Sequence, residues 1–285
     1  MKIIKKTDSK KKFVKKLYPI VDDVVKKLGE CGFRKVVFLF TENPKKAFLD
    51  VFNPKRMPHG RQYGKMELWI SESVSSFSIQ EGKDVKIMIN IKDPFIRDLE
   101  YARGLIAHEY MHAILKYRGI EPRISKVGGE QWPFIIKTLE RIGENYEDVL
   151  TDLIKLVTFL ILCMKDLIVD TVLIENGFEK EIMKQRKLNS VAGRKRLKVD
   201  KKNLVDIMTL YIGFQNMWIP FRLKYKGFGV RIPFKIPEQV ERECNKVIKE
   251  LEDVRPGARN HSKEIREVVL AGLEAYRKLY KKLKK

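Results

Sequence analysis

Apolar side chains recur at helical spacing near the start of the chain, over residues 13–29. Leu17, Val21 and Val24 belong to this series, and Gly29 follows its last apolar position. Spacing of three and four residues places such side chains on one face of a helix. A glycine just after the last periodic residue is a typical helix end. We therefore expect a helix over residues 13–29.

Four shorter runs have the character of strands. They are apolar or alternate between apolar and polar residues, and they are bounded by turn-forming residues. The runs cover residues 35–40 (KVVFLF), 47–52, 67–71 (ELWIS) and 85–91 (VKIMINI). We expect these segments to form one small sheet.

The next helix should begin at Asp93-Pro94. Aspartate is a favoured N-cap, and proline is favoured at the first helical position. Apolar positions continue at helical spacing to about Arg118, and Gly119 follows as a helix end.

The remainder of the chain is dominated by helical patterns. We expect helices over 133–142, about 145–164 and about 165–175, with two amphipathic helices near the end. Residues 183–203 are rich in lysine and arginine and poor in apolar residues, which predicts a linker or mobile loop with a solvated surface. Strands followed by helices indicate the α+β class, with a small mixed sheet and a mostly helical C-terminal half.

This pattern also predicts the domain organisation. We expect a first domain over residues 1–182, the basic segment 183–203, and a helical subdomain over 204–285. A chain of 285 residues with 44% hydrophobic content is long enough and apolar enough to bury a hydrophobic core in such a domain.

The chain is strongly basic, with 59 Lys and Arg against 37 Asp and Glu, a formal charge of +22. Such a charge attracts nucleic acid, anionic membrane or acidic substrate. The basic residues are spread along the whole chain, so we favour a lysine-rich solvated surface and treat nucleic acid as a less favoured partner. Abundant lysine and glutamate with little cysteine resembles the composition of thermophile proteins.

No disulfide framework or membrane span is expected. The three cysteines lie far apart and form no CxxC pair, which suits a reducing cytoplasm. The N-terminal segment has no apolar core of signal-peptide length. The most apolar stretch, residues 156–174, is interrupted by Lys165, Asp166 and Asp170, and we interpret it as a buried helix.

The segment HEYMH carries the main chemical signal. It places His108 and His112 four residues apart, on one face of a helix, where both imidazoles can reach one metal ion. Neutral imidazole binds zinc at about 2.0–2.1 Å. Glu109 follows the first histidine and can accept a proton from a water that zinc activates by lowering its pKa to about 7. We therefore expect a Zn²⁺ site with Glu109 as general base.

A third protein ligand is needed, and the next acidic cluster begins at Glu144. HEYMH followed by GENYED resembles the gluzincin clan of zincin metallopeptidases, in particular the GENxxD motif of neprilysin-type enzymes. The resemblance covers about residues 85–155. It implies that Glu144 is the third ligand, that Asp148 orients a ligand histidine, and that strand 85–91 is the sheet edge that pairs with an extended peptide.

Other ligands stay open. Gly143 is a typical helix end, and Asn145 is a good N-cap, which would leave Glu144 outside the following helix. Glu147 or Asp148 would then be the ligand. The remaining alternatives are Asp166, Asp170 and His261.

The sequence thus predicts a zinc-dependent metallopeptidase that hydrolyses peptide bonds in a peptide or protein substrate. The alternative is a zincin-fold metal-binding protein without peptidase activity, associated with nucleic acid through its basic surface. An intact Glu109 favours the enzyme, because a purely structural metal site does not need a general base.

Overall fold

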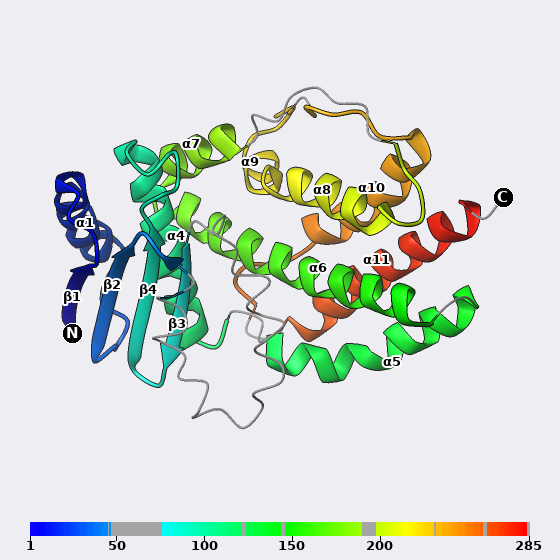
Figure 1. Ribbon diagram of the computed structural model, residues 1–285, viewed down its shortest axis with the longest axis horizontal. Coiled ribbons are helices and arrows are strands. Elements are labelled where there is room, and N and C mark those ends of the chain that lie inside the picture. The colour runs from blue at the N-terminus through cyan, green and yellow to red at the C-terminus, as the bar shows by residue number, and fades with distance from the viewer. Residues whose placement is uncertain are drawn as a thin grey trace. The chain divides into compact units, whose positions relative to one another are not determined.

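The structure is a computed structural model, shown in Figure 1. It describes residues 1–44, 46, 76–120, 124–143, 146–189, 198–230, 232–258 and 261–283. The chain divides into two compact units. The first unit comprises Met1–Tyr117 and Glu175–Gln185, and the second comprises Arg118–Ile174 and Arg186–Lys285.

The first unit contains a four-stranded mixed sheet with the order β1-β2-β4-β3. The strands are β1 (Lys2–Thr7), β2 (Lys35–Thr41), β3 (Ser76–Glu81) and β4 (Asp84–Asn90). β1, β2 and β4 are parallel, whereas β3 is antiparallel to β4. Gly82, with φ of +60°, lies in the tight turn between β3 and β4, a backbone conformation that suits glycine. The expected small mixed sheet and the α+β class are confirmed.

The expected position of strand 85–91 in the sheet is wrong. β4 covers this segment but pairs with β2 on one side and β3 on the other, so it is an interior strand. Its residues from Ile87 to Asn90 are all buried, as a strand covered by neighbours requires. Among the described strands, β3 lies at this edge of the sheet. The expected strands 47–52 and 67–71 lie outside the described residues.

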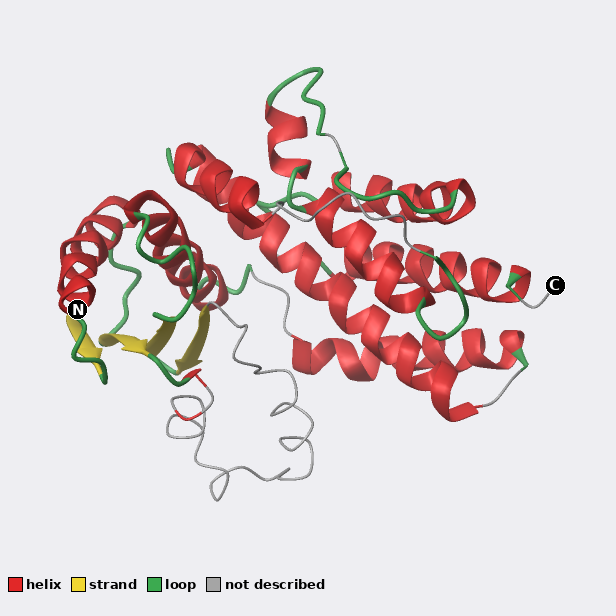
Figure 2. Ribbon diagram, turned by 45° about the horizontal axis from the view of Figure 1, so that its top comes forward, coloured by secondary structure: helices red, strands yellow, loops and turns green. Residues whose placement is uncertain are grey.

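Helices pack on one face of the sheet, as Figure 2 shows for the first unit. A short 3₁₀ helix η1 (Lys12–Leu17) leads into α1 (Tyr18–Leu28), which ends at Gly29 with φ of +81°. α1 packs against α4 (Leu99–Tyr117), and α4 contacts β3 and β4. The expected helix over residues 13–29 is therefore confirmed, with its first part, up to Leu17, in 3₁₀ form.

The start of the active-site helix differs from the sequence prediction. α4 begins at Leu99, because the Oδ1 atom of Asp98 accepts hydrogen bonds from the amides of Glu100 and Tyr101. Asp93 instead caps a turn, in which its Oδ1 accepts a hydrogen bond of 2.8 Å from the amide of Phe95. An aspartate favours N-caps and turns equally well, so the sequence alone does not distinguish them.

The second unit is helical. Its helices are α5 (Ile124–Ile142), most of α6 (Tyr146–Glu175), the end of α7 (Glu179–Asn189), α8 (Leu204–Asn216), α9 (Ile219–Lys224), α10 (Glu238–Glu252) and α11 (Ser262–Lys282). The mostly helical C-terminal half and its two final amphipathic helices are confirmed. The second unit's core includes Leu153, Leu160, Ile212 and Val268, all fully buried.

Two expected boundaries in this half are wrong. α6 is one continuous helix, although the sequence pattern predicts separate helices over 145–164 and 165–175. No glycine or proline separates these segments, so the hydrogen-bond ladder has no reason to stop. Residues 183–189, expected in a linker or loop, belong to helix α7. Residues 190–197 of that basic segment lie outside the described residues, and the predicted three-part domain division stays a prediction.

None of the helices in the described part of the chain has the length and apolar character needed to cross a membrane. α6 has sufficient length, but ionisable side chains interrupt it at Lys165, Asp166 and Asp170. An uninterrupted run of about 20 apolar residues is needed to span the hydrocarbon core of a bilayer.

Candidate metal and catalytic centre

Helix α4 directs two imidazoles to one point. His108 and His112 lie one turn apart, and their Nε2 atoms are 3.0 Å from each other. The ring centroids are 4.6 Å apart, and the ring planes are nearly perpendicular at 82°. Both histidines are half-buried, while Ala107, Glu109 and Met111 beside them are buried. The predicted convergence of the two rings is therefore present.

The distance between the two nitrogens fits a shared cation. Two ligands at about 2.0–2.1 Å from a tetrahedral metal are separated by about 3.3 Å, close to the 3.0 Å between these Nε2 atoms. Nitrogen donors of this kind are typical of zinc sites. The pair therefore belongs to a candidate metal-binding group, as two donors of a set that needs at least one more.

Glu109 projects from the same helix, and its side chain is buried with 7% of the residue exposed. Its Oε1 atom accepts a hydrogen bond of 2.7 Å from the hydroxyl of Ser76. Ser76 is the first residue of β3, so the beginning of this edge strand reaches the carboxylate. An ionised carboxylate is stabilised by such a donor when burial removes water from it.

The sequence carries no signal that singles out Ser76. Residues 72–76 (ESVSS) have no periodic pattern and no motif that would single out one serine. The contact joins residues 33 positions apart, and it depends on the pairing of β3 with β4. Only knowledge of the strand order could have pointed to it.

Several polar contacts fix α4 in the first unit. The hydroxyl of Tyr101 donates a hydrogen bond of 2.8 Å to Asp93 near the start of the helix. The hydroxyl of Tyr110 donates to the carbonyl oxygen of Gly29 at 3.0 Å, and burial raises its pKa above the usual range. Such contacts limit rotation of the helix, and they hold its histidines in place.

Helix α7 supports α4 from another side. Arg103 of α4 binds the carboxylates of Asp23 at 2.6 Å and Glu181 at 2.5 Å. Gly104 lies against the backbone of Glu181, where a Cβ atom would be 3.0 Å from the carbonyl oxygen. Gly104 precedes His108 by one helical turn, so the close contact between α4 and the backbone of α7 lies one turn from the first histidine.

The predicted third ligand is not placed by the structure. Glu144 lies outside the described residues. Glu147 and Asp148 occupy the first turn of α6, and both are exposed. Asp148 lines a cavity of about 410 Å³ in the second unit. The other residues that line this cavity come from α6, from the turn that precedes α8, and from α11. The roles of Glu144, Glu147 and Asp148 stay predictions.

The remaining alternatives have different surroundings. Asp170 is 1% exposed and forms an ion pair with Arg186, which already occupies its carboxylate. His261 precedes α11 and is 4% exposed; neither ring nitrogen has a hydrogen-bond partner among the described residues. Burial lowers the pKa of His261. Asp166 is half-buried on α6.

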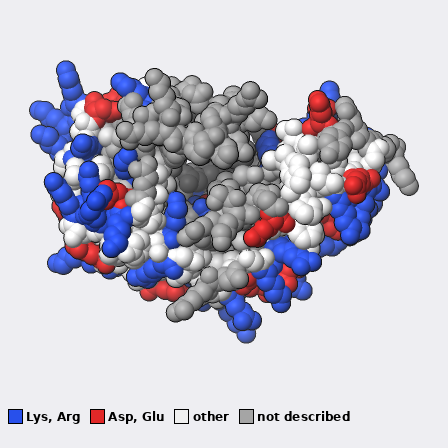
Figure 3. Space-filling view, turned by 90° about the horizontal axis from the view of Figure 1, so that it is seen from below, with Lys and Arg blue, Asp and Glu red and all other residues white. Residues whose placement is uncertain are grey.

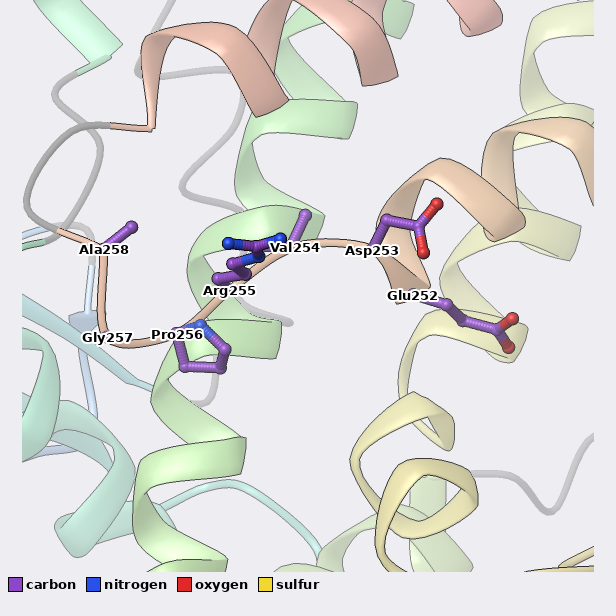
Figure 4. A pocket seen from close by; sticks show the side chains of 7 residues that line it. All are labelled: Glu252, Asp253, Val254, Arg255, Pro256, Gly257 and Ala258. Atoms are coloured by element: carbon purple, nitrogen blue, oxygen red, sulfur yellow. The ribbon is translucent and has the colours of Figure 1, made fainter.

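Two other features contribute no candidate chemistry. A surface hollow of about 740 Å³ is lined by residues 252–258, between α10 and α11, as Figure 4 shows. It contains no histidine or cysteine, and its Glu252 is bound to Arg222.

The cysteines are free thiols. Burial raises the pKa of Cys163, and it raises the pKa of Cys244 to about 12. Neither buried thiol is suited to act as a thiolate nucleophile or ligand.

Comparison of the chain with protein-family models, curated protein sequences and solved structures found no match.

Proposed function

We propose that this protein is a zinc-dependent metallopeptidase. One observation carries the proposal: two Nε2 atoms converge to 3.0 Å on a helix that presents a buried carboxylate at the adjoining residue. A metal site that is only structural has no need of this carboxylate, whose burial costs free energy. The expected resemblance to gluzincins points to the same reaction.

His108 and His112 would hold the ion through Nε2, with a third ligand predicted from residues 144–148. A bound zinc ion supplies a Lewis acid that polarises the scissile carbonyl and lowers the pKa of water. The imidazoles must stay neutral to bind it. Both imidazoles are half-buried.

Glu109 would move the protons of the reaction. The hydroxyl of Ser76 occupies Oε1. No hydrogen bond within the described residues occupies Oε2, so this oxygen can accept a proton from the attacking water. The same carboxyl group then delivers that proton to the amine nitrogen as the C–N bond breaks. The carboxylate is regenerated, and one water is consumed for each bond cleaved.

β3 would align the substrate. Among the strands that the structure describes it lies at the edge of the sheet, next to β4, and α4 packs against it. An extended peptide can add to such an edge through backbone hydrogen bonds, a mode that tolerates many sequences. Because Ser76 is the first residue of β3, a peptide on this edge would pass close to Glu109. The substrate class is therefore an extended peptide or unfolded protein segment.

The test combines metal analysis with cleavage of a mixed peptide library followed by mass spectrometry. We expect stoichiometric zinc and cleavage in the native protein. Glu109→Gln should keep the zinc but lose at least about 100-fold in rate, the scale of general-base catalysis. His108→Ala should lose both zinc and activity.

Glu100→Gln is the matched control, because Glu100 is exposed on the same helix and the substitution is the same. It should keep native zinc content and rate. Zinc in the native protein without cleavage of any peptide would contradict the proposal and favour a metal-binding protein without peptidase activity.

A further inference from the structure

Residues 207–237 form the longest stretch of the chain without aspartate or glutamate. Within it, residues 217–237 (MWIPFRLKYKGFGVRIPFKIP) contain only apolar and aromatic residues, glycine, proline and five lysines or arginines. Serine, threonine, asparagine, glutamine and histidine are missing as well. We call residues 217–237 the acid-free segment. Loops on a solvated surface are typically rich in neutral polar and acidic residues, so this composition indicates a surface with another role.

The acid-free segment has a packed aromatic base. It follows α8 directly, contains α9 and leads to α10; Figure 1 shows its course from α9 to α10 along the upper edge of the second unit. The rings of Trp218, Phe221 and Phe228 contact one another, with centroids 5.8 to 6.0 Å apart. Trp218 and Phe221 are buried. The base therefore holds the chain on both sides of the residues that lie between Phe221 and Phe228.

The residues held by this base form an exposed tip, residues 223–227, all five of which are exposed. The amide of Phe228 donates a hydrogen bond of 3.1 Å to the carbonyl oxygen of Tyr225, which closes a tight turn. Gly227 has φ of +80°, as the third residue of a type II turn requires. The tip is therefore a defined turn on a packed support.

Two large apolar side chains of the tip face water. Leu223 is 54% exposed, the highest value among the large hydrophobic residues that the structure describes, and Tyr225 is 40% exposed. The other exposed residues of this kind in the described part of the chain are each separated from the next by more than ten positions. Single exposed hydrophobic residues are common on protein surfaces, whereas neighbouring ones mark an interaction site.

Cations alternate with these apolar side chains. Lys224 and Lys226 are both exposed, and the ammonium group of Lys224 lies 5.4 Å from the centre of the Tyr225 ring. In the described part of the chain no carboxylate lies within 4 Å of Lys226. Arg222, at the base, is bound to Glu252 and adds no charge to the tip. Elsewhere the charges are mixed: on the face that Figure 3 shows, Asp and Glu lie among the Lys and Arg side chains.

We propose that the tip inserts into the headgroup layer of an anionic membrane and thereby binds the protein to the bilayer surface. Leu223 and Tyr225 would leave water at the boundary between headgroups and acyl chains, a depth that aromatic side chains favour. Lys224 and Lys226 would stay among the anionic headgroups, with their aliphatic stems beside the inserted side chains. This function is separate from the proposed peptidase activity.

Other polyanions fit the tip less well. Single-stranded nucleic acid binds by stacking its bases on open aromatic rings. Trp218 and Phe221 are buried, and the most exposed apolar side chain of the tip, Leu223, is aliphatic. A protein interface is depleted in lysine and carries about ten hydrogen bonds. Tyrosine and lysine are the only side chains of the tip that can form them. A lipid surface requires only hydrocarbon and positive charge.

The test is co-sedimentation of the full chain with vesicles of phosphatidylcholine that contain either no phosphatidylserine or about 30% of it. We expect at least about tenfold tighter binding to the anionic vesicles, since one lysine near such a surface contributes about fivefold in affinity. Replacing Leu223 and Tyr225 together by serine should weaken this binding at least about tenfold. Lys226→Gln should weaken it about fivefold.

Two matched controls use exposed residues outside the acid-free segment. Replacing Leu270 and Leu283 together by serine removes two exposed leucines, each 38% exposed, and keeps every charge. Lys249→Gln removes one exposed lysine of α10. Both variants should bind the anionic vesicles within about twofold of the native protein. Circular dichroism should be native-like for all variants, because every change is at an exposed position.

A second measurement locates the contact. Tyr225→Trp should gain fluorescence that lipids brominated near the headgroup quench, whereas Leu270→Trp should gain fluorescence that they leave unchanged. Equal quenching of the two tryptophans would overturn the inference. So would a failure of the native chain to sediment with anionic vesicles, equal binding to both kinds of vesicle, or equal weakening by the two double serine variants.

A labelled single-stranded oligonucleotide and polyglutamate serve as probes for the other partner classes. If replacing Leu223 and Tyr225 by serine abolished binding to either probe and left vesicle binding unchanged, the tip would belong to a nucleic-acid or protein interface, and the inference would be wrong. Peptide cleavage plays no part in these measurements, so their outcome is independent of the proposed enzymatic activity.

Discussion

The hydroxyl of Ser76 lies 2.7 Å from the Oε1 atom of Glu109 and donates a hydrogen bond to it. The contact connects the first residue of an edge strand with the carboxylate that stands beside the histidine pair. β3 would thus bind the peptide substrate, and through Ser76 it would also position the Glu109 carboxylate that is proposed to transfer the protons. Ser76 is a positioning residue in this arrangement.

Ser76→Ala should therefore lower kcat about tenfold with little change in KM, because a hydrogen bond to a charged group contributes about 1.4 kcal/mol or more. Ser76→Thr keeps the hydroxyl and should restore most of the rate. Steady-state kinetics on a cleaved peptide measures both. Ser78→Ala, on the same strand, is the control. A kcat for Ser76→Ala equal to that of the native protein would show that the Glu109 carboxylate does not need the Ser76 hydrogen bond.

Zinc affinity should identify the third ligand among the predicted acids. Glu144→Gln, Glu147→Gln and Asp148→Asn each remove one carboxylate charge with little change in size. Loss of a ligand should release zinc on dialysis, whereas loss of a residue that only orients a histidine should weaken binding about 10- to 100-fold. Competition with a chelator measures this. Glu140→Gln, at an exposed site on α5, should behave as native. Unchanged affinity in all three variants would exclude this segment as the ligand source.

Gly104→Ala should destabilise the protein by about 1–3 kcal/mol, because the new methyl group would lie 3.0 Å from a backbone oxygen of α7. Urea unfolding followed by circular dichroism measures the loss. Gly257→Ala adds the same methyl group where no atom lies within 4 Å. That control should be neutral or slightly stabilising, since alanine reduces the freedom of the unfolded chain. Equal stability of the two variants would mean that α7 can move away from α4.

Asp170→Asn should cost about 3–5 kcal/mol of unfolding free energy, because it removes a buried carboxylate charge that forms an ion pair with Arg186. Asp170 is 1% exposed, so water cannot replace the lost partner. The control is Asp206→Asn, which breaks the exposed pair with Lys155 and should cost about 0–1 kcal/mol. Thermal or urea unfolding measures both. A loss below about 1 kcal/mol for Asp170→Asn would contradict the prediction.

His261 should make stability depend on pH. Burial lowers its pKa below the unfolded value of about 6.5, so the folded state binds this proton less readily than the unfolded state. The unfolding free energy should therefore fall as pH decreases from about 6.5, and this contribution should be constant above about pH 7.

The matched comparison is His261→Asn, a neutral polar side chain at the same position. As the pH is lowered from about 7 to 5, the unfolding free energy of the native protein should fall because of His261, whereas asparagine does not titrate and makes no such contribution. The unfolding free energy of the native protein should therefore approach that of the variant. Unfolding at matched zinc content and several pH values tests this. A difference that does not change with pH would show that His261 keeps its ordinary pKa.

The sequence predicts features whose causes are local. Gly29, Gly119 and Gly143 all have positive φ and follow helices, because a residue without Cβ adopts that conformation at little cost. The spacing of His108 and His112 likewise determines that both rings share a helix face.

Features that depend on distant pairing were missed. β1 (KIIKKT) has few apolar residues, and it becomes a strand by pairing with β2, which lies far along the chain. β3 (SFSIQE) has an equally weak pattern, and without it the edge of the sheet was assigned to the wrong strand. The contact between Ser76 and Glu109 follows from the same pairing. Strand propensity is strongly dependent on tertiary context, which explains these omissions.

The first unit is assembled from two stretches of chain, Met1–Tyr117 and Glu175–Gln185. The returning stretch carries Glu181, which binds Arg103 and lies against Gly104, and Lys184, which binds Asp98 at 2.8 Å. A truncated gene product that stops after Tyr117 would lack this stretch and would leave the back of the histidine helix uncovered. Anyone wishing to express the sheet and its helices as a minimal protein must therefore graft residues 175–185 back onto it, by circular permutation or by a designed linker.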